Sequence, residues 1–193
     1  MVVQARLLLF LLPIVLLVKE SNAQDSKIKR DSTLRLLTFG LPNFEMQNAE
    51  NVVAARYGFH FYGVAGCDVN QELEDSVEKV NAPVYAYLEK RHGKGWYDNF
   101  TKDVEKEFLV QKEVFSLLEK EPVIIKRQQL LKEESNGLEY ILEAITTTQY
   151  DVLAYGWGRL SPNTSDELVV YYHLIVDLKK QSVKLLSDTV RKL

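Results

Sequence analysis

The chain has 193 residues, with 24 Lys or Arg against 27 Asp or Glu, so its formal net charge is −3 at pH 7. This length fits one domain or at most two very small ones, and a hydrophobic content of 46% is ordinary for a packed core. The near balance of charges excludes a general electrostatic footprint for nucleic acid or for an acidic membrane surface.

The N-terminus has the pattern of a secretory signal. Arg6 precedes an apolar run of 12 residues from Leu7 to Val18, and Ser21-Asn22-Ala23 supplies a small-x-small ending. The run is shorter than the roughly 20 residues that a membrane-spanning helix needs. We therefore expect export and removal of the signal after Ala23 or Gln24; the alternative is a signal anchor that stays uncut.

Three segments follow from this interpretation. Residues 1–23 are the expected signal peptide, residues 24–32 a polar and flexible arm, and residues 33–193 a single α+β domain. No second long apolar stretch occurs, so the processed chain is expected to be soluble and to have no membrane span.

The first part of the domain is expected to contain a strand, a helix and a second strand. Thr33 to Phe39 is mostly apolar and predicts a central strand. Asn43 is a plausible cap for a helix from Phe44 to Tyr57, which Gly58 ends. Phe59 to Val69 alternates like a strand. The order suggests a parallel pair with a helical crossover, or a split version with another strand between them.

Three helices are expected next. Asn70 caps the first, whose apolar stripe runs from Leu73 to Arg91 and includes Pro83, where we expect a bend. Aromatic and aliphatic residues repeat every fourth position in the second, from Trp96 to Glu119. The third is shorter and covers Val123 to Glu134.

The last part of the chain is expected to be an antiparallel meander. Leu138 to Thr146 fits a helix or a strand, and the strands that follow favour a strand. Tyr150 to Leu160, Leu168 to Val176 and Ser182 to Asp188 complete the series. The fold class is therefore α+β: two layers, with a mainly antiparallel sheet and helices packed on one side.

Cys67 is the only cysteine, so an intramolecular disulfide is impossible. As a catalytic nucleophile it would need a base, and His60, His92 and His173 are the only histidines. Cys67 shares the expected strand face of Phe61, which predicts a buried and unreactive thiol. No ligand spacing typical of a metal site occurs, and no catalytic residue, metal or cofactor is expected.

The C-terminal strands offer one candidate binding surface. Tyr155, Trp157 and Arg159 share a face of one expected strand, and Tyr171 and His173 share a face of the next. If both faces point outward, they form an aromatic and basic patch suited to a peptide, a sugar or a partner protein. The alternative is that the helix from Trp96 to Glu119 covers them.

Two segments resemble exported bacterial proteins that contain a FEKKY domain. They are ARYGFHFYGVAGC at residues 55–67 and LEKRHGKGW at residues 88–96. The chain departs from that pattern at Asp68 and Pro83. The resemblance covers about the first half of the processed chain and implies a location in the cell envelope, periplasmic or secreted, and a small α+β domain. It implies no activity and carries over no catalytic residue.

These observations favour an exported, non-enzymatic interaction or ligand-binding module. The alternatives are a thiol- or His-dependent enzyme and a secreted inhibitor or regulator of another exported protein. Two observations discriminate the enzyme from the binding module: the reactivity of Cys67 in the native protein, and whether a concave pocket gathers His60, His92 or His173.

Overall fold

A computed structural model describes residues 34–133, 136–161 and 165–193. The expected signal peptide and arm at 1–32 lie outside the described residues. The elements are β1 (Arg35–Phe39), α1 (Gln47–Tyr57), β2 (His60–Ala65), α2 (Gln71–His92), α3 (Trp96–Leu118), α4 (Pro122–Glu133), β3 (Glu139–Ala144), β4 (Gln149–Gly158), β5 (Glu167–Asp177), β6 (Ser182–Ser187) and β7 (Arg191–Lys192).

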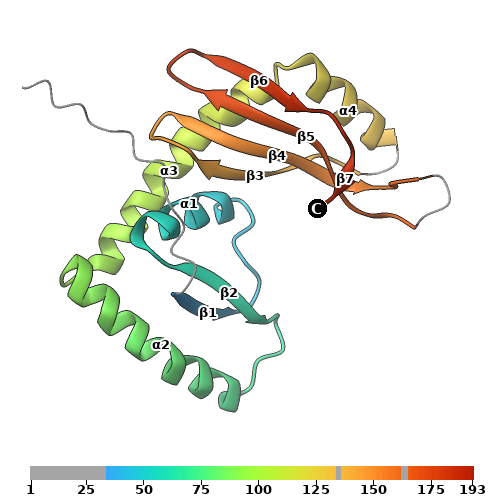
Figure 1. Ribbon diagram of the computed structural model, residues 1–193. Helices are drawn as coiled ribbons and strands as arrows, with labels where there is room; N and C mark the ends of the chain where they lie inside the picture. The colour runs from blue at the N-terminus through green and yellow to red at the C-terminus, as the bar shows by residue number, and fades with distance from the viewer. Residues whose placement is uncertain (1–33, 134–135, 162–164) are drawn as a thin grey trace, which may run out of the picture.

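The described strands form two separate sheets (Figure 1). The larger is antiparallel, with the order β3-β4-β5-β6, and β7 also pairs with β5. The smaller contains only β1 and β2, which are parallel. This confirms the α+β class and the C-terminal meander, including a strand over residues 139–144. It corrects one expectation, because the first strand is not central to a large sheet.

The small sheet is built by the predicted crossover. Chain reversal after α1 occurs at Gly58, whose φ of 84° lies in the left-handed region that favours glycine. The N-terminus of α1 differs from the prediction: the helix begins at Gln47, and Met46 rather than Asn43 occupies the cap position, without a side-chain bond. Asn43 instead accepts a hydrogen bond at its carbonyl from the Met46 N–H.

The α2 helix begins as its sequence predicts, since the Asn70 side chain accepts a hydrogen bond from the Leu73 N–H at 2.9 Å. The helix continues past Pro83 to His92. The bend expected at Pro83 stays a prediction. Pro122 is the first residue of α4, a position where the missing N–H of proline costs nothing.

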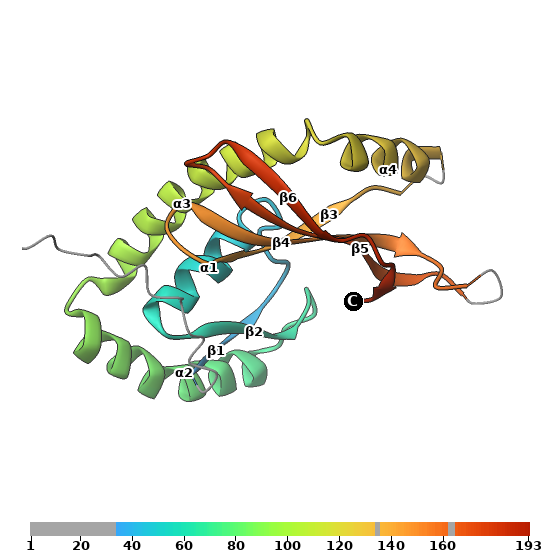
Figure 2. The same cartoon turned by 45° about the horizontal axis from the view of Figure 1, so that its top comes forward.

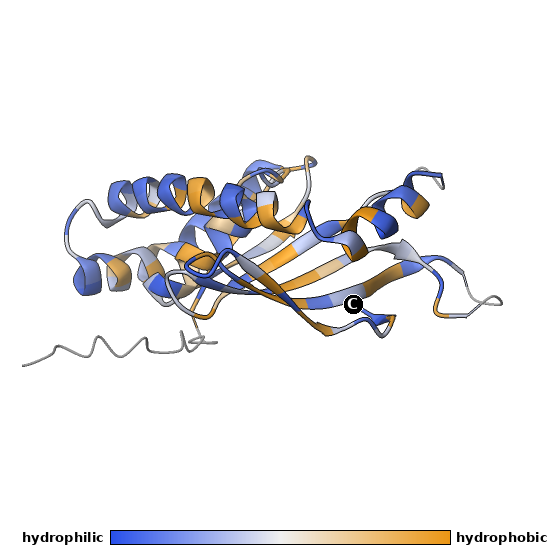
Figure 3. Ribbon diagram, turned by 90° about the horizontal axis from the view of Figure 1, so that it is seen from above, coloured by the Kyte–Doolittle hydropathy of each residue, from blue (hydrophilic) through white to orange (hydrophobic). Residues whose placement is uncertain are grey.

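The long helix α3 and the shorter α4 lie along one face of the large sheet (Figures 1 and 2). Hydrophobic stretches on the strands alternate with polar ones, and the helices are banded in the same way (Figure 3). The core between these layers includes Val114, Leu118, Ile124, Leu131, Tyr150, Val152 and Leu174. A second core surrounds Leu36, Val53, Phe59, Leu88, Trp96 and Phe100, where the small sheet meets α1, α2 and α3.

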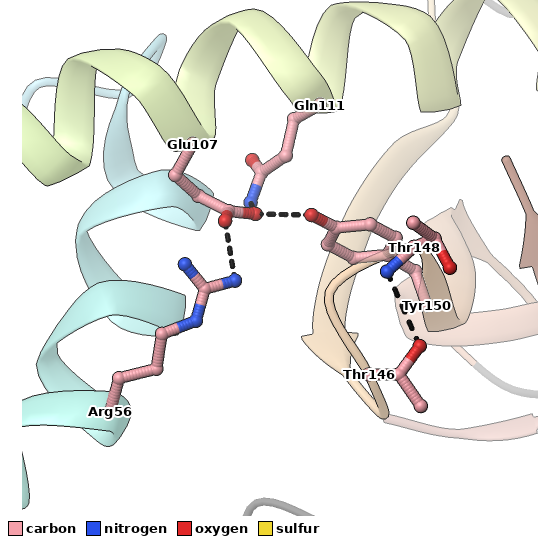
Figure 4. Close-up of polar contacts among 6 residues, drawn as sticks. All are labelled: Arg56, Glu107, Gln111, Thr146, Thr148 and Tyr150. Carbon is pink, nitrogen blue, oxygen red and sulfur yellow. Dashed lines mark hydrogen bonds and ion pairs between the residues drawn. The ribbon is translucent and has the colours of Figure 1, made fainter. Parts of the chain in front are cut away.

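A buried polar cluster joins the two cores (Figure 4). The Glu107 carboxylate on α3 is only 3% exposed. It accepts hydrogen bonds from the Tyr150 hydroxyl at 2.7 Å and from the Gln111 amide at 3.0 Å, and it pairs with the Arg56 guanidinium at 2.5 Å. Burial and this carboxylate both raise the pKa of Tyr150, so the phenol stays a donor. The cluster thereby ties α1, α3 and β4 together.

Among the described helices, none is both long enough and apolar enough to cross a membrane.

Candidate binding cleft

A cleft of about 850 Å³ separates the small sheet from β3, the edge strand of the large sheet. The residues that line it belong to the small sheet and α1 on one side and to β3 and β4 on the other. The polar side chains that line it come from all three sides: Arg35 and His60 from the small sheet, Gln47 and Asn51 from α1, and Glu139 and Tyr155 from the large sheet. Phe44 and Ile141 add apolar surface.

Helix periodicity places the α1 residues in the cleft. Gln47, Asn51 and Ala55 are four residues apart, so they lie on one face of the helix. The opposite face carries Ala49 and Val53 into the core. Sequence reasoning missed this lining because polar residues on a helix are usually solvated, and the strand that faces them is more than 80 residues away in the chain.

Tyr155 and Glu139 form a fixed pair on the wall of the cleft. The Tyr155 hydroxyl donates a hydrogen bond to the Glu139 carboxylate at 2.6 Å. Burial, and then this bond and the charge of the carboxylate, raise the pKa of Tyr155 to about 12. The phenol is therefore neutral at physiological pH and stays a hydrogen-bond donor to Glu139, which also lines the cleft.

The Asn48 side chain covers the centre of the β3 edge. Its amide nitrogen donates to the Tyr140 carbonyl at 2.9 Å, and its amide oxygen accepts from the Leu142 N–H at 3.2 Å. One side chain thus satisfies a donor and an acceptor that would otherwise be open to another strand. This contact also fixes the distance between α1 and the large sheet, and therefore the width of the cleft.

A second, smaller hollow of about 200 Å³ adjoins the cleft at Ile141. His173 and Asp151 lie in it, and the imidazole Nε2 is 2.6 Å from a carboxylate oxygen of Asp151. Arg191 lines the same hollow. The face of the large sheet that lies away from α3 and α4 is therefore hollowed over several strands. It carries side chains of both charge signs.

The predicted aromatic and basic patch is divided by the structure. Tyr155 lies in the cleft, His173 lies in the adjoining hollow, and Trp157 is 51% exposed. Arg159 follows the end of β4 and pairs with Asp166 at 2.7 Å. Helix α3 does not cover these four residues. Tyr171 differs, because it is buried on the other face of the sheet under α4.

A register shift explains why Tyr171 turns inward. Ala154 pairs with Tyr172, but Tyr155 pairs with Val170, so Tyr171 is an extra residue in β5. The Tyr171 ring packs against Gly158, where a Cβ atom would overlap the Tyr171 hydroxyl. That hydroxyl donates a hydrogen bond to the Trp157 carbonyl at 2.8 Å. The guanidinium of Arg127 on α4 lies 4.5 Å from the ring centroid. Strict alternation therefore predicted the wrong face for this residue.

The expected environment of Cys67 is also wrong. Strand β2 ends at Ala65, and Cys67 lies beyond it in an exposed bend. The strand ends early because its partner β1 is only five residues long and terminates at a register shift. Of the histidines, His60 lines the cleft, and the His92 Nε2–H donates a hydrogen bond to the Tyr57 carbonyl at 3.0 Å. Cys67 is not among the residues that line either hollow.

We predict rapid labelling of Cys67 in the native protein. Because its side chain is exposed, a soluble thiol reagent should modify the folded chain at a rate within about threefold of the unfolded chain at the same pH. Cys67→Ser should change the free energy of unfolding by less than about 0.5 kcal/mol. Stopped-flow labelling with and without denaturant measures the first effect. Strong protection in the folded state would contradict the exposed bend.

The described part of the chain contains no group of three or more His, Cys, Asp or Glu side chains arranged to hold a metal ion. Comparison of the chain with protein-family models, with curated proteins and with solved structures finds no significant match.

Proposed function

We propose that this protein is an exported, non-enzymatic binding module and that the cleft between its two sheets is the ligand site. The observation that supports this best is the convergence of a guanidinium, an imidazole, three amides and a carboxylate on one hollow of about 850 Å³. Ligand sites of small proteins have this size and this combination of apolar walls with a few convergent polar groups. A peptide, a sugar or a loop of a partner protein fits this chemistry.

The arrangement of the histidines and the cysteine supports binding over thiol chemistry. A cysteine nucleophile requires a base within hydrogen-bond reach. His60 lies in the cleft and Cys67 lies outside it, beyond the opposite end of β2. His173 is held by Asp151 in the adjoining hollow. The polar groups of the cleft itself are those that position a ligand.

The proposal is tested by filling the cleft. Asn51 is exposed on α1 and lines the site, so Asn51→Trp should place an indole in the ligand space without disturbing either core. Lys102→Trp, on an exposed part of α3 away from the cleft, is the matched control. A glycan array and a phage-displayed random peptide library are the probes.

Ligands selected by the unmodified protein should lose at least about tenfold in affinity for Asn51→Trp and less than about twofold for Lys102→Trp. Equal binding by both variants would show that the ligand lies elsewhere. If neither library contains a ligand, the binding module itself is contradicted.

Export is tested separately. The Ser21-Asn22-Ala23 ending predicts that the exported chain begins at Gln24 or Asp25. Intact mass of the protein recovered from the exported fraction measures the cleavage point. A chain that retains Leu7 to Val18 would contradict the proposed processing.

A further inference from the structure

Among the described strands, side chains close the outer edges of β1 and β3, whereas the outer edge of β2 is open. The free edge of β1 is closed by Asn81 of α2, whose amide bonds both the N–H and the carbonyl of Leu37, at 2.9 and 2.8 Å. The edge of β3 is closed by Asn48. On β6, Lys184 and a register shift protect the edge, which are two of the devices that proteins use against unwanted pairing.

The second edge of β2 has none of these protections. The sequence of the strand, HFYGVA, contains no lysine, no acidic residue and no proline. Within the described ranges only β1 pairs with it, and no side-chain hydrogen bond reaches its outer edge. An exposed, uncharged edge of this kind is a template for another strand.

The register identifies the groups that are open. His60 donates its N–H to the Leu34 carbonyl, so the main-chain groups of His60 and Tyr62 point toward β1. Because successive residues of a strand point their main-chain groups in opposite directions, those of Phe61 and Gly63 point to the outer edge. A Cβ built on Gly63 meets no atom within 4 Å, so the face of the sheet at Gly63 has room for a side chain.

We propose that the ligand of the cleft is an extended peptide segment that adds to β2 as a third strand. This inference rests on the proposed function and names its ligand class. Main-chain N–H and carbonyl groups at strand spacing are matched by another peptide backbone, which a glycan does not supply. β2 begins inside the cleft, where Phe59 and His60 line the wall, and its outer edge runs from there past Gly63.

The surroundings favour a single segment over a second folded copy. A second copy that paired through its own β2 would have to bring its sheet and helices up to the start of this strand, where His60 lines the cleft. A single extended segment enters alone. Beside β2 it meets Tyr62, which is 50% exposed, and the exposed Val64 on the same face, so apolar residues at alternate positions of the peptide are expected to pack there.

Gly63→Pro is the sharpest variant for testing this arrangement. Proline removes the N–H at the outer edge but no hydrogen bond between β1 and β2, and proline is tolerated on edge strands in this orientation. Gly63→Ala retains the N–H and is the matched control, since its Cβ meets open space. Peptides selected from the random phage library on the exported chain are the probes.

The selected peptides should bind Gly63→Pro at least about tenfold more weakly than the unmodified protein, and Gly63→Ala within about threefold. Methylation of every second main-chain nitrogen of the peptide tests the same bonds. It should weaken binding as strongly as Gly63→Pro does when the methylated nitrogens face β2, and only a little when they face away from it. Hydrogen exchange supplies a readout that needs no variant: the Phe61 and Gly63 amides should exchange rapidly in the free protein and become protected when peptide is bound.

Other results overturn the inference in distinguishable ways. Amides of Phe61 and Gly63 already protected in the free chain would show that its own N-terminal segment or a second copy occupies the edge; size-exclusion chromatography with light scattering separates these two. Peptide binding that is lost in Asn51→Trp but kept in Gly63→Pro would place the peptide in the cleft without strand addition. Binding of glycans alone would also overturn it while the proposed function stands.

Discussion

Glu107→Ala is expected to lower the free energy of unfolding by about 3–5 kcal/mol, because it removes a buried carboxylate that is the acceptor for the half-buried Arg56 and for two further side-chain donors. The Arg56 guanidinium would lose its carboxylate, and the Tyr150 hydroxyl and the Gln111 amide would lose their acceptor. Urea unfolding followed by circular dichroism measures the change. A loss this large is a substantial part of the stability of a domain of ordinary size.

Two further variants separate this explanation from a general loss of helix α3. Glu105 lies on the exposed face of the same helix, and Glu105→Ala should change stability by less than about 0.5 kcal/mol. Tyr150→Phe removes one charge-assisted bond and should cost about 1.5–3 kcal/mol. Its effect should be clearly smaller in the Glu107→Ala background, since both belong to one network. Full additivity would contradict a connected cluster.

Asn81→Ala is expected to cost about 2–3 kcal/mol. Asn81 is 6% exposed, and its side chain bonds both the donor and the acceptor of Leu37, so its removal leaves two main-chain groups of β1 without a partner. Val80, the preceding residue, is largely exposed on the same helix, and Val80→Ala is the control, with a change of less than about 0.5 kcal/mol. Thermal unfolding of the two variants measures the difference.

The same variant should also have a local effect. When the clamp on β1 is lost, amides of the small sheet should exchange faster with solvent, while those of the large sheet keep their protection. Equal acceleration in both sheets would indicate that the two cores unfold together and that Asn81 has no separate role in holding β1.

Local signals in the sequence predicted most of the elements. The four-residue repeat that begins at Trp96 identified α3, and Asn70 and Gly58 marked helix ends correctly. The same stripe also contained an overlooked signal. Glu107 and Gln111 continue its spacing toward Val114, so two polar residues occupy positions of the buried face, which indicates a buried polar network.

Contacts between residues far apart in the chain could not be predicted from the sequence. Asn81 reaches a strand 44 residues away and Asn48 reaches one 92 residues away, and nothing in their local windows distinguishes them from solvated amides. The separation of the strands into two sheets has the same cause. A single inserted residue at Tyr171 reversed its face, because alternation carries no information about where a partner strand slips.

The contrast between the two tryptophans has a practical consequence. Trp96 is 5% exposed within the core around the small sheet, whereas Trp157 is 51% exposed on the strand that also carries Tyr155 into the cleft. Iodide therefore quenches the fluorescence of one indole and spares the other in the native state. Emission from Trp96 follows unfolding, and quenching of Trp157 follows what happens on the open face of the large sheet. The two tryptophans are therefore separate fluorescence reporters: Trp96 reports unfolding of the core, and Trp157 reports changes in solvent access at the surface.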